Sequence, residues 1–132
     1  MAGLGYVRAG VAADVSSDWP DVVIVLRGEL DMASAPELTR VFDGVVGFRG
    51  PRVVLDLSRL EFIDACGLHA IECARDRLSG QGGALVVRNP LTIVRRVLGI
   101  CGLSDWRETP EEIVLEPAEE ARVMTGLRSQ GL

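Results

Sequence analysis

Asp64, Cys66 and His69 lie close together in the stretch FIDACGLHA (62–70), where an apolar run meets a helix-like pattern. A thiol in the first turn of a helix can be activated as a thiolate by the helix dipole, which would suit redox sensing or nucleophilic catalysis. The Asp64 carboxylate opposes that activation, and His69 follows on the same predicted helix at a spacing that rarely gives nucleophile–base geometry. We therefore predict no catalytic residue, and redox-modulated binding at Cys66 stays open.

The cysteines give no sign of a metal site. The chain has three of them, Cys66, Cys73 and Cys101, with no C-x-x-C pair and a single histidine. Scattered cysteines of odd number lack ligand spacing and are most simply free thiols in a reducing cytoplasm. We predict no metal and no cofactor, and we interpret Cys73 and Cys101 as small packing residues within helices.

Two polar residues are interpreted first as helix caps. Asp64 precedes the helix predicted over 65–79, where its carboxylate can accept from free N–H groups. Ser34 is followed by Pro36 and Glu37, a pattern typical of a capping box at the start of a helix. Ser58 follows the core of a predicted strand and is interpreted as a turn residue rather than as a site of phosphorylation.

Composition narrows the class of partner. The 132 residues are 48% hydrophobic and 25% charged, with a net charge of −5, which is typical of a globular domain and argues against a nucleic-acid partner. No apolar stretch approaches the roughly 20 residues of a membrane span, and the N-terminus lacks the apolar region of a signal peptide. We expect a cytoplasmic protein that does not bind membranes.

The order of predicted elements indicates an α/β fold. Strand–helix–strand units require parallel pairing with right-handed crossovers, and the two N-terminal strands can form an antiparallel hairpin. The result is a mixed β-sheet with helices packed on it, in which sites tend to lie where strands end and helices begin. Two such junctions are 28–34 and 62–68. The predicted strands are 5–15, 22–31, 51–64, 84–89 and a short one near 105–109; the predicted helices are 34–47, 65–79, one after Asn89 and Pro90 as its N-cap and first residue, and 116–128.

Three stretches together resemble the STAS domain of anti-sigma factor antagonists. They are LRGELDMASAPEL (26–38), VVLDLSRLEFIDACGLHAI (53–71) and GGALVVRNPLTIVRRVLGICGL (82–103). The resemblance covers roughly residues 7–127 and implies a single STAS domain over 1–132, with short flexible ends and a STAS-like fold. It also implies a cytoplasmic, non-enzymatic regulator whose partner is an anti-sigma factor, often a serine kinase that phosphorylates its antagonist. A weak homodimer is left open.

This chain departs from the family pattern at the position of the usual phosphoacceptor, residue 65. In the family a serine or threonine commonly follows the Asp of this turn, whereas this chain has Ala65, then Cys66 in place of the next serine. Alanine has no oxygen to phosphorylate, so we predict no phosphoacceptor there. What the resemblance implies for binding is a surface made by the 29–34 loop, the 62–68 turn and the following helix: Glu29, Leu30, Asp31, Met32, Ser34, Ile63, Asp64, Ala65, Cys66, Gly67 and His69.

The alternative is a small-ligand or redox-sensing module of the same fold, with its input at Cys66 or at a surface pocket. Some STAS domains are reported to bind nucleotides, and Arg95 and Arg96 could face a phosphate. No Gly-rich phosphate loop is present, so we interpret these arginines as part of a solvated helix face.

Overall fold

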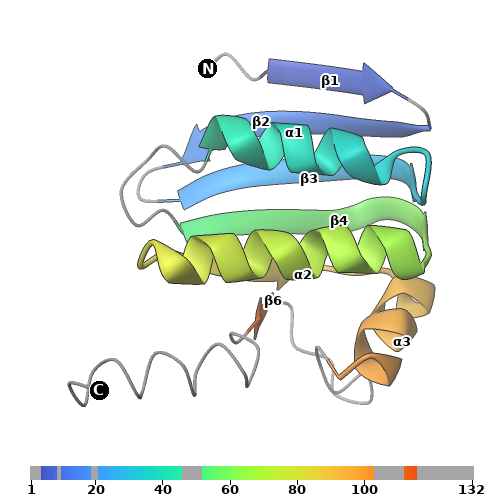
Figure 1. The fold of residues 1–132 in the computed structure, drawn as a ribbon. Helices are drawn as coiled ribbons and strands as arrows, with labels where there is room; N and C mark the ends of the chain where they lie inside the picture. The colour runs from blue at the N-terminus through green and yellow to red at the C-terminus, as the bar shows by residue number, and fades with distance from the viewer. Residues whose placement is uncertain (1–3, 9, 19–20, 46–51, 103–111, 116–132) are drawn as a thin grey trace.

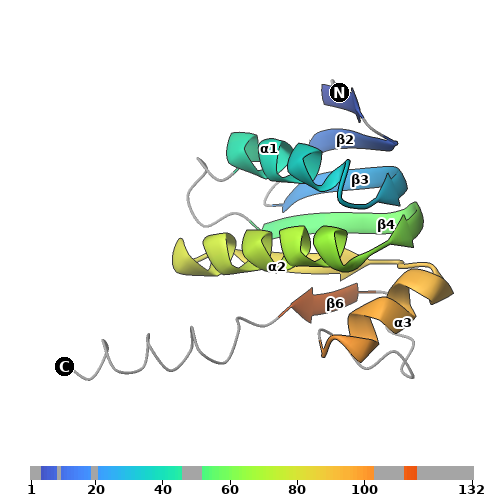
Figure 2. The ribbon, with the colours of Figure 1, turned by 45° about the vertical axis from the view of Figure 1, so that its right-hand side comes forward.

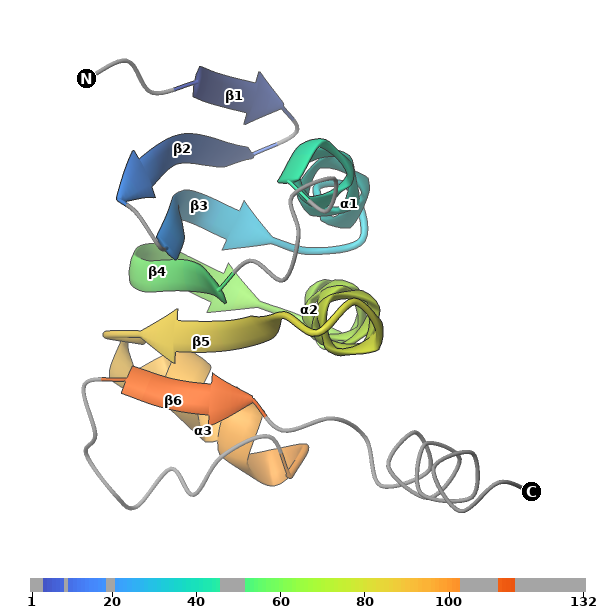
Figure 3. The same cartoon turned by 90° about the vertical axis from the view of Figure 1, so that its left-hand side faces the viewer.

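The computed structural model describes residues 4–8, 10–18, 21–45, 52–102 and 112–115. Within them, six strands form one mixed sheet in the order β1-β2-β3-β4-β5-β6 (Figures 1 and 3). The predicted α/β fold with a mixed sheet is confirmed. The elements are β1 (Leu4–Arg8), β2 (Val11–Asp18), β3 (Asp21–Leu30), α1 (Ala35–Val45), β4 (Arg52–Ile63), α2 (Ala65–Gly80), β5 (Ala84–Arg88), α3 (Thr92–Ile100) and β6 (Glu112–Leu115).

The centre of the sheet is parallel and its flanks are antiparallel. Strands β3, β4 and β5 pair in parallel through the crossover helices α1 and α2, while β2 pairs antiparallel with β3 as predicted. Helices α1 and α2 cover one face of the sheet (Figure 3), and α3 lies beside the end of β4 (Figures 1 and 2). The carboxyl ends of β3 and β4 therefore meet at one edge, where the chain enters α1 and α2.

The main hydrophobic core lies between the sheet and these two helices. The predicted apolar stripes are confirmed, because each places its residues among the buried side chains of this core. Leucine, isoleucine and valine side chains from the central strands complete it, as the low aromatic content requires. Burying such side chains supplies most of the stabilising free energy, at roughly 25 cal/mol per Å² of apolar surface. The stripes are Leu38, Val41, Phe42 and Val45 on α1, and Leu68, Ile71, Ala74 and Leu78 on α2.

The other face of the sheet combines a short apolar row with charged side chains. Val23, Val54 and Val86 are register partners on β3, β4 and β5 and form a small second cluster. On the same face, Arg52 makes ion pairs with both Asp21 and Glu112. Helices α1 and α2 both lie on the opposite face (Figure 3), and long arginine side chains can cover apolar surface while their charged heads stay in water.

The single strand predicted over 5–15 is wrong, because this segment forms two strands. The chain turns at Gly10, whose φ of 91° lies in the left-handed region that favours glycine. Gly28 on β3 has a φ of 95°, and a Cβ atom there would lie 2.2 Å from the Gly10 carbonyl oxygen. That oxygen accepts a hydrogen bond from the Glu29 amide at 3.0 Å, so the turn between β1 and β2 rests on the end of β3.

The helix predicted after residue 88 starts later than expected. Asn89 adopts a left-handed conformation with φ 51°, which asparagine tolerates, so it cannot serve as the N-cap. Helix α3 instead begins at Thr92 after Leu91, which makes no side-chain capping bond. Ser58, predicted in a turn, lies inside β4 at an irregularity of the strand.

The packing role predicted for two cysteines is also wrong. Cys73 on the outer face of α2 and Cys101 at the end of α3 are both exposed. Each helix buries only one stripe, and these residues fall outside it. The strand predicted near 105–109 and the helix predicted over 116–128 lie outside the described residues.

Candidate functional site

Asp64 joins β4 to α2 and caps the helix, as predicted. Its backbone is extended, with φ −111° and ψ −174°, and its carboxylate Oδ1 accepts a hydrogen bond from the Gly67 amide at 2.9 Å. A carboxylate at this position also interacts favourably with the positive end of the helix dipole. The conformation of the 62–68 turn is thus stabilised by a hydrogen bond between two of its own residues.

Asp64 also connects the two strand–helix junctions. Its second carboxylate oxygen, Oδ2, accepts from the Met32 amide at 3.2 Å, and its own amide donates to the Leu30 carbonyl oxygen at 3.1 Å. Gly67 allows this close approach, because a Cβ atom there would lie 2.4 Å from that same Leu30 oxygen. The loop before α1 and the start of α2 are therefore held together as one unit.

Internal hydrogen bonds close the loop between β3 and α1. The Ser34 hydroxyl donates to the Glu29 carbonyl oxygen at 2.7 Å and accepts from the Asp31 amide at 2.9 Å. Asp31 Oδ1 in turn accepts from the amides of Ala33 and Ser34, each at 3.0 Å. The predicted capping box is wrong: Ser34 is fully buried in the loop, and the Glu37 amide donates to its backbone carbonyl instead.

The predicted binding residues divide into an outer and an inner group. Those in the outer group have exposed side chains, and Met32 is 75% exposed. Those in the inner group are enclosed and hold the outer ones in place. The outer group is Glu29, Met32, Ala65, Cys66 and His69; Asp31 and Asp64 are partly buried; the inner group is Leu30, Ser34, Ile63 and Gly67.

Phe62 is a candidate that sequence reasoning missed. It is 43% exposed at the end of β4 and is the register partner of Glu29 on β3. Large exposed apolar side chains often mark an interaction surface when they cluster. Its position directly before the buried Ile63 was the available signal, because neighbouring residues of a strand point to opposite faces.

The site carries little chemistry of its own. His69 Nε2 lies 3.4 Å from Cys73 Sγ, one turn further along α2, so its contact is with that thiol rather than with Cys66. Within the residues that the structure describes, no group of three potential metal ligands occurs, and no helix is long and apolar enough to span a membrane. The arrangement suits binding by shape and apolar contact.

This fold and this edge of the sheet define a STAS domain. The STAS domain family model matches residues 11–114, which is most of the chain. The chain therefore belongs to the STAS domain family. No curated protein matches it.

Solved structures agree with the family. An anti-sigma factor antagonist from Mycobacterium paratuberculosis is 28% identical, with a TM-score of 0.63 over 89% of this chain and 94% of the other. SpoIIAA, an anti-sigma factor antagonist, in its unphosphorylated form is 21% identical, with a TM-score of 0.62 over 89% of this chain and 96% of its own. The phosphorylated form of SpoIIAA from Bacillus has a TM-score of 0.58 at 21% identity, over 88% of this chain and 99% of the other. At these lower identities SpoIIAA supports the fold alone.

Proposed function

We propose that this protein is an anti-sigma factor antagonist that binds an anti-sigma factor through Glu29, Met32, Phe62, Ala65, Cys66 and His69, here called the docking surface. Membership of the STAS family and the 28% identical antagonist support this role. The observation that carries the proposal is the link between the two junctions through Asp64, since it presents both loops as one rigid surface before any partner arrives. Preorganised surfaces lose less entropy on binding.

On this proposal the protein acts by binding and not by catalysis. Ala65 is exposed at the start of α2, where a kinase could reach a hydroxyl if one were present. The usual phosphorylation switch is therefore absent at this residue, and the partner is released by other means. Anti-sigma factors of this kind are often serine kinases. We place the interaction between the two proteins in the cytoplasm.

The test replaces Ala65 with Glu. A carboxylate forced into an apolar contact without a partner loses its hydration, which costs at least a few kcal/mol and weakens binding by about tenfold or more. The fold should tolerate the change, because position 65 is exposed and lies at the helix N-terminus. Thr39→Glu is the matched control, since Thr39 is an exposed residue of α1 outside the docking surface.

The partner is first captured from the native lysate and identified by mass spectrometry as an anti-sigma factor. Titration calorimetry then measures its affinity for the unmodified chain and for both variants, beside thermal melts. We expect weaker binding for Ala65→Glu at an unchanged melting temperature, and no change for Thr39→Glu. Unchanged affinity for Ala65→Glu would place the interface elsewhere, and capture of no anti-sigma factor would refute the proposed function.

A second experiment concerns the missing switch. Incubation of the chain with the captured kinase and ATP should add no phosphate at residue 65, whereas Ala65→Ser should become a substrate because the surrounding turn keeps its cap. Intact-mass measurement detects an added phosphate in the unmodified chain or in Ala65→Ser, and peptide mapping locates the modified residue. A kinase that modifies another antagonist but leaves Ala65→Ser untouched would show that the docking surface has diverged.

A further inference from the structure

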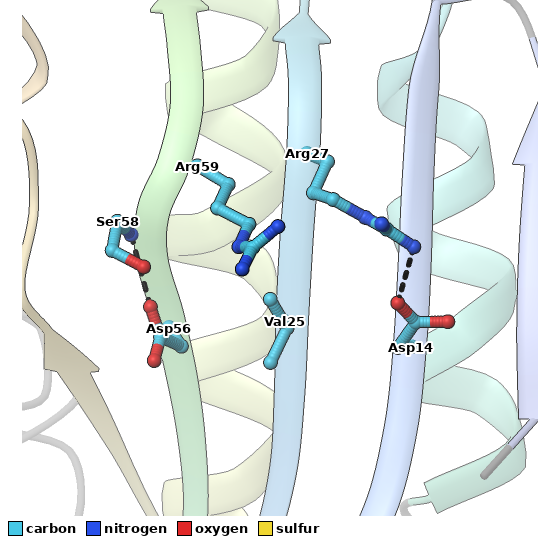
Figure 4. Close-up of a pocket in the computed structure, with 6 residues that line it drawn as sticks. All are labelled: Asp14, Val25, Arg27, Asp56, Ser58 and Arg59. Carbon is cyan, nitrogen blue, oxygen red and sulfur yellow. Dashed lines mark hydrogen bonds and ion pairs between the residues drawn. The ribbon is translucent and has the colours of Figure 1, made fainter.

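A shallow pocket of about 440 Å³ lies on the sheet face that α1 and α2 leave uncovered (Figure 4). Its size falls within the range of small-molecule sites. The floor is Val25 on β3, and charged or polar side chains from three neighbouring strands surround it. The lining residues are Asp14, Val25, Arg27, Asp56, Ser58 and Arg59.

An irregularity in the β3–β4 register creates this pocket. Val25 pairs with Asp56, but the next register pair is Arg27 with Arg59, so β4 contributes one extra residue between them. Such a bulge changes the direction in which a strand presents its side chains. It makes two arginines direct cross-strand neighbours, and like charges in this position are destabilising unless an anion lies nearby.

Only one of the two arginines has an acceptor. Arg27 extends away from Arg59 and pairs with Asp14 on β2, whereas Arg59 extends from β4 toward β3 and ends above Val25 (Figure 4). The Arg59 side chain makes no hydrogen bond or ion pair with any described residue, although two carboxylates line the same pocket. Its guanidinium is therefore available to a ligand.

The nearer carboxylate, Asp56, is already occupied. It accepts from the Ser58 amide at 2.9 Å and from Arg88 at 3.4 Å. Burial alone would raise the pKa of Asp56, but the Ser58 hydrogen bonds and the Arg88 guanidinium outweigh it and hold that pKa below its ordinary value. With Asp14 paired to Arg27 and Asp56 to Arg88, Arg59 leaves one positive charge unmatched.

We propose that this pocket binds a small monocarboxylate. The Arg59 guanidinium would take the carboxylate in a two-pronged hydrogen bond, and a short apolar body would cover Val25. A single negative charge balances the single unmatched positive one, whereas a dianion such as phosphate would also meet Asp14 and Asp56. The pocket shares no residue with the docking surface, so this proposal does not depend on the proposed function.

The test is an NMR titration of the ¹⁵N-labelled chain with sodium butyrate at constant ionic strength and neutral pH. We expect saturable shifts of the Arg27, Ser58 and Arg59 amides, with a dissociation constant of about 1–10 mM, as a ligand of few atoms allows. Acetate should bind more weakly because it has less apolar surface to cover Val25, and inorganic phosphate should bind more weakly because of its second charge.

Variants decide whether Arg59 carries the site. Arg59→Gln should weaken butyrate binding at least about fivefold, and Arg59→Lys should recover part of the loss because it restores the charge without the fork. The control is Arg40→Gln, an exposed arginine on α1, which should bind as the unmodified chain does. The absence of saturable shifts in the pocket, equal binding by Arg59→Gln, or tighter binding of phosphate than of butyrate would each overturn the proposal.

Discussion

Replacing Asp64 should separate its two structural roles. In Asp64→Ala both carboxylate bonds are lost: the cap on the Gly67 amide and the link to the Met32 amide. Removal of an N-cap costs about 1 kcal/mol, and a hydrogen bond from a partly exposed amide to a carboxylate adds about the same. We expect the free energy of unfolding to fall by about 2 kcal/mol, which lowers the melting temperature by roughly 6–10 °C for a domain of this size.

Asp64→Asn is the matched variant. Asparagine caps helices about as well as aspartate, so its Oδ1 can keep the bond from Gly67, but its amide nitrogen cannot accept from Met32. This variant should lose only about 1 kcal/mol, and that loss should be local to the link between the two loops.

Denaturant unfolding combined with amide hydrogen exchange tests both steps. In Asp64→Asn the Met32 amide should exchange about fivefold faster while the Gly67 amide keeps its protection; in Asp64→Ala both should exchange faster. Equal destabilisation by the two variants, or an unchanged Met32 amide in Asp64→Asn, would refute the idea that the carboxylate ties the loops together.

Two further variants probe the same region and the opposite face of the sheet. Gly67→Ala should destabilise the fold by about 1–3 kcal/mol, because the added methyl group would meet the Leu30 carbonyl oxygen at 2.4 Å; a denaturant midpoint equal to that of the unmodified chain would contradict this packing. Asp56→Asn should change the response to acid. The pKa of Asp56 is lowered in the folded state, so its stabilising contribution is present above the pKa of the unfolded chain, about 4, and is lost as the pH falls through the folded value. Unfolding free energies between about pH 5 and pH 2 should therefore decline less steeply in Asp56→Asn than in the unmodified chain, and parallel pH profiles would argue against the Arg88 and Ser58 interactions.

The elements with strong periodicity could be predicted from sequence, and so could the cap at Asp64. Apolar stripes such as Leu68 and Ile71 indicate directly which helix face is buried. An aspartate directly before such a stripe is strongly favoured as an N-cap. The order of strands and helices also located both strand–helix junctions, which the structure places at one edge of the sheet. Their contact through Met32 needed the three-dimensional structure, because no local pattern reports a bond between residues so far apart in the chain.

Two of the incorrect predictions share a physical cause, which is that one polar side chain can serve two different local structures. Ser34 matches a capping box locally, but Asp31 and the Glu29 carbonyl offer its hydroxyl partners inside the loop. Asn89 was expected to cap a helix, yet asparagine is equally suited to the left-handed conformation that it adopts. The pocket around Arg59 was invisible in the sequence, because a strand irregularity is set by pairing with the neighbouring strand.

The contact between Gly10 and Gly28 joins the turn at Gly10 to the end of β3, next to the proposed docking surface. The Gly10 carbonyl oxygen accepts from the amide of Glu29, a residue of the proposed docking surface, so the backbone there depends on a turn near the start of the chain. The two glycines are sterically linked, since a side chain at position 28 would require the turn at Gly10 to move. For the protein engineer, an expression plasmid that starts after residue 10 would yield a chain in which Glu29 has lost its acceptor, and affinities measured on that chain would describe a different surface.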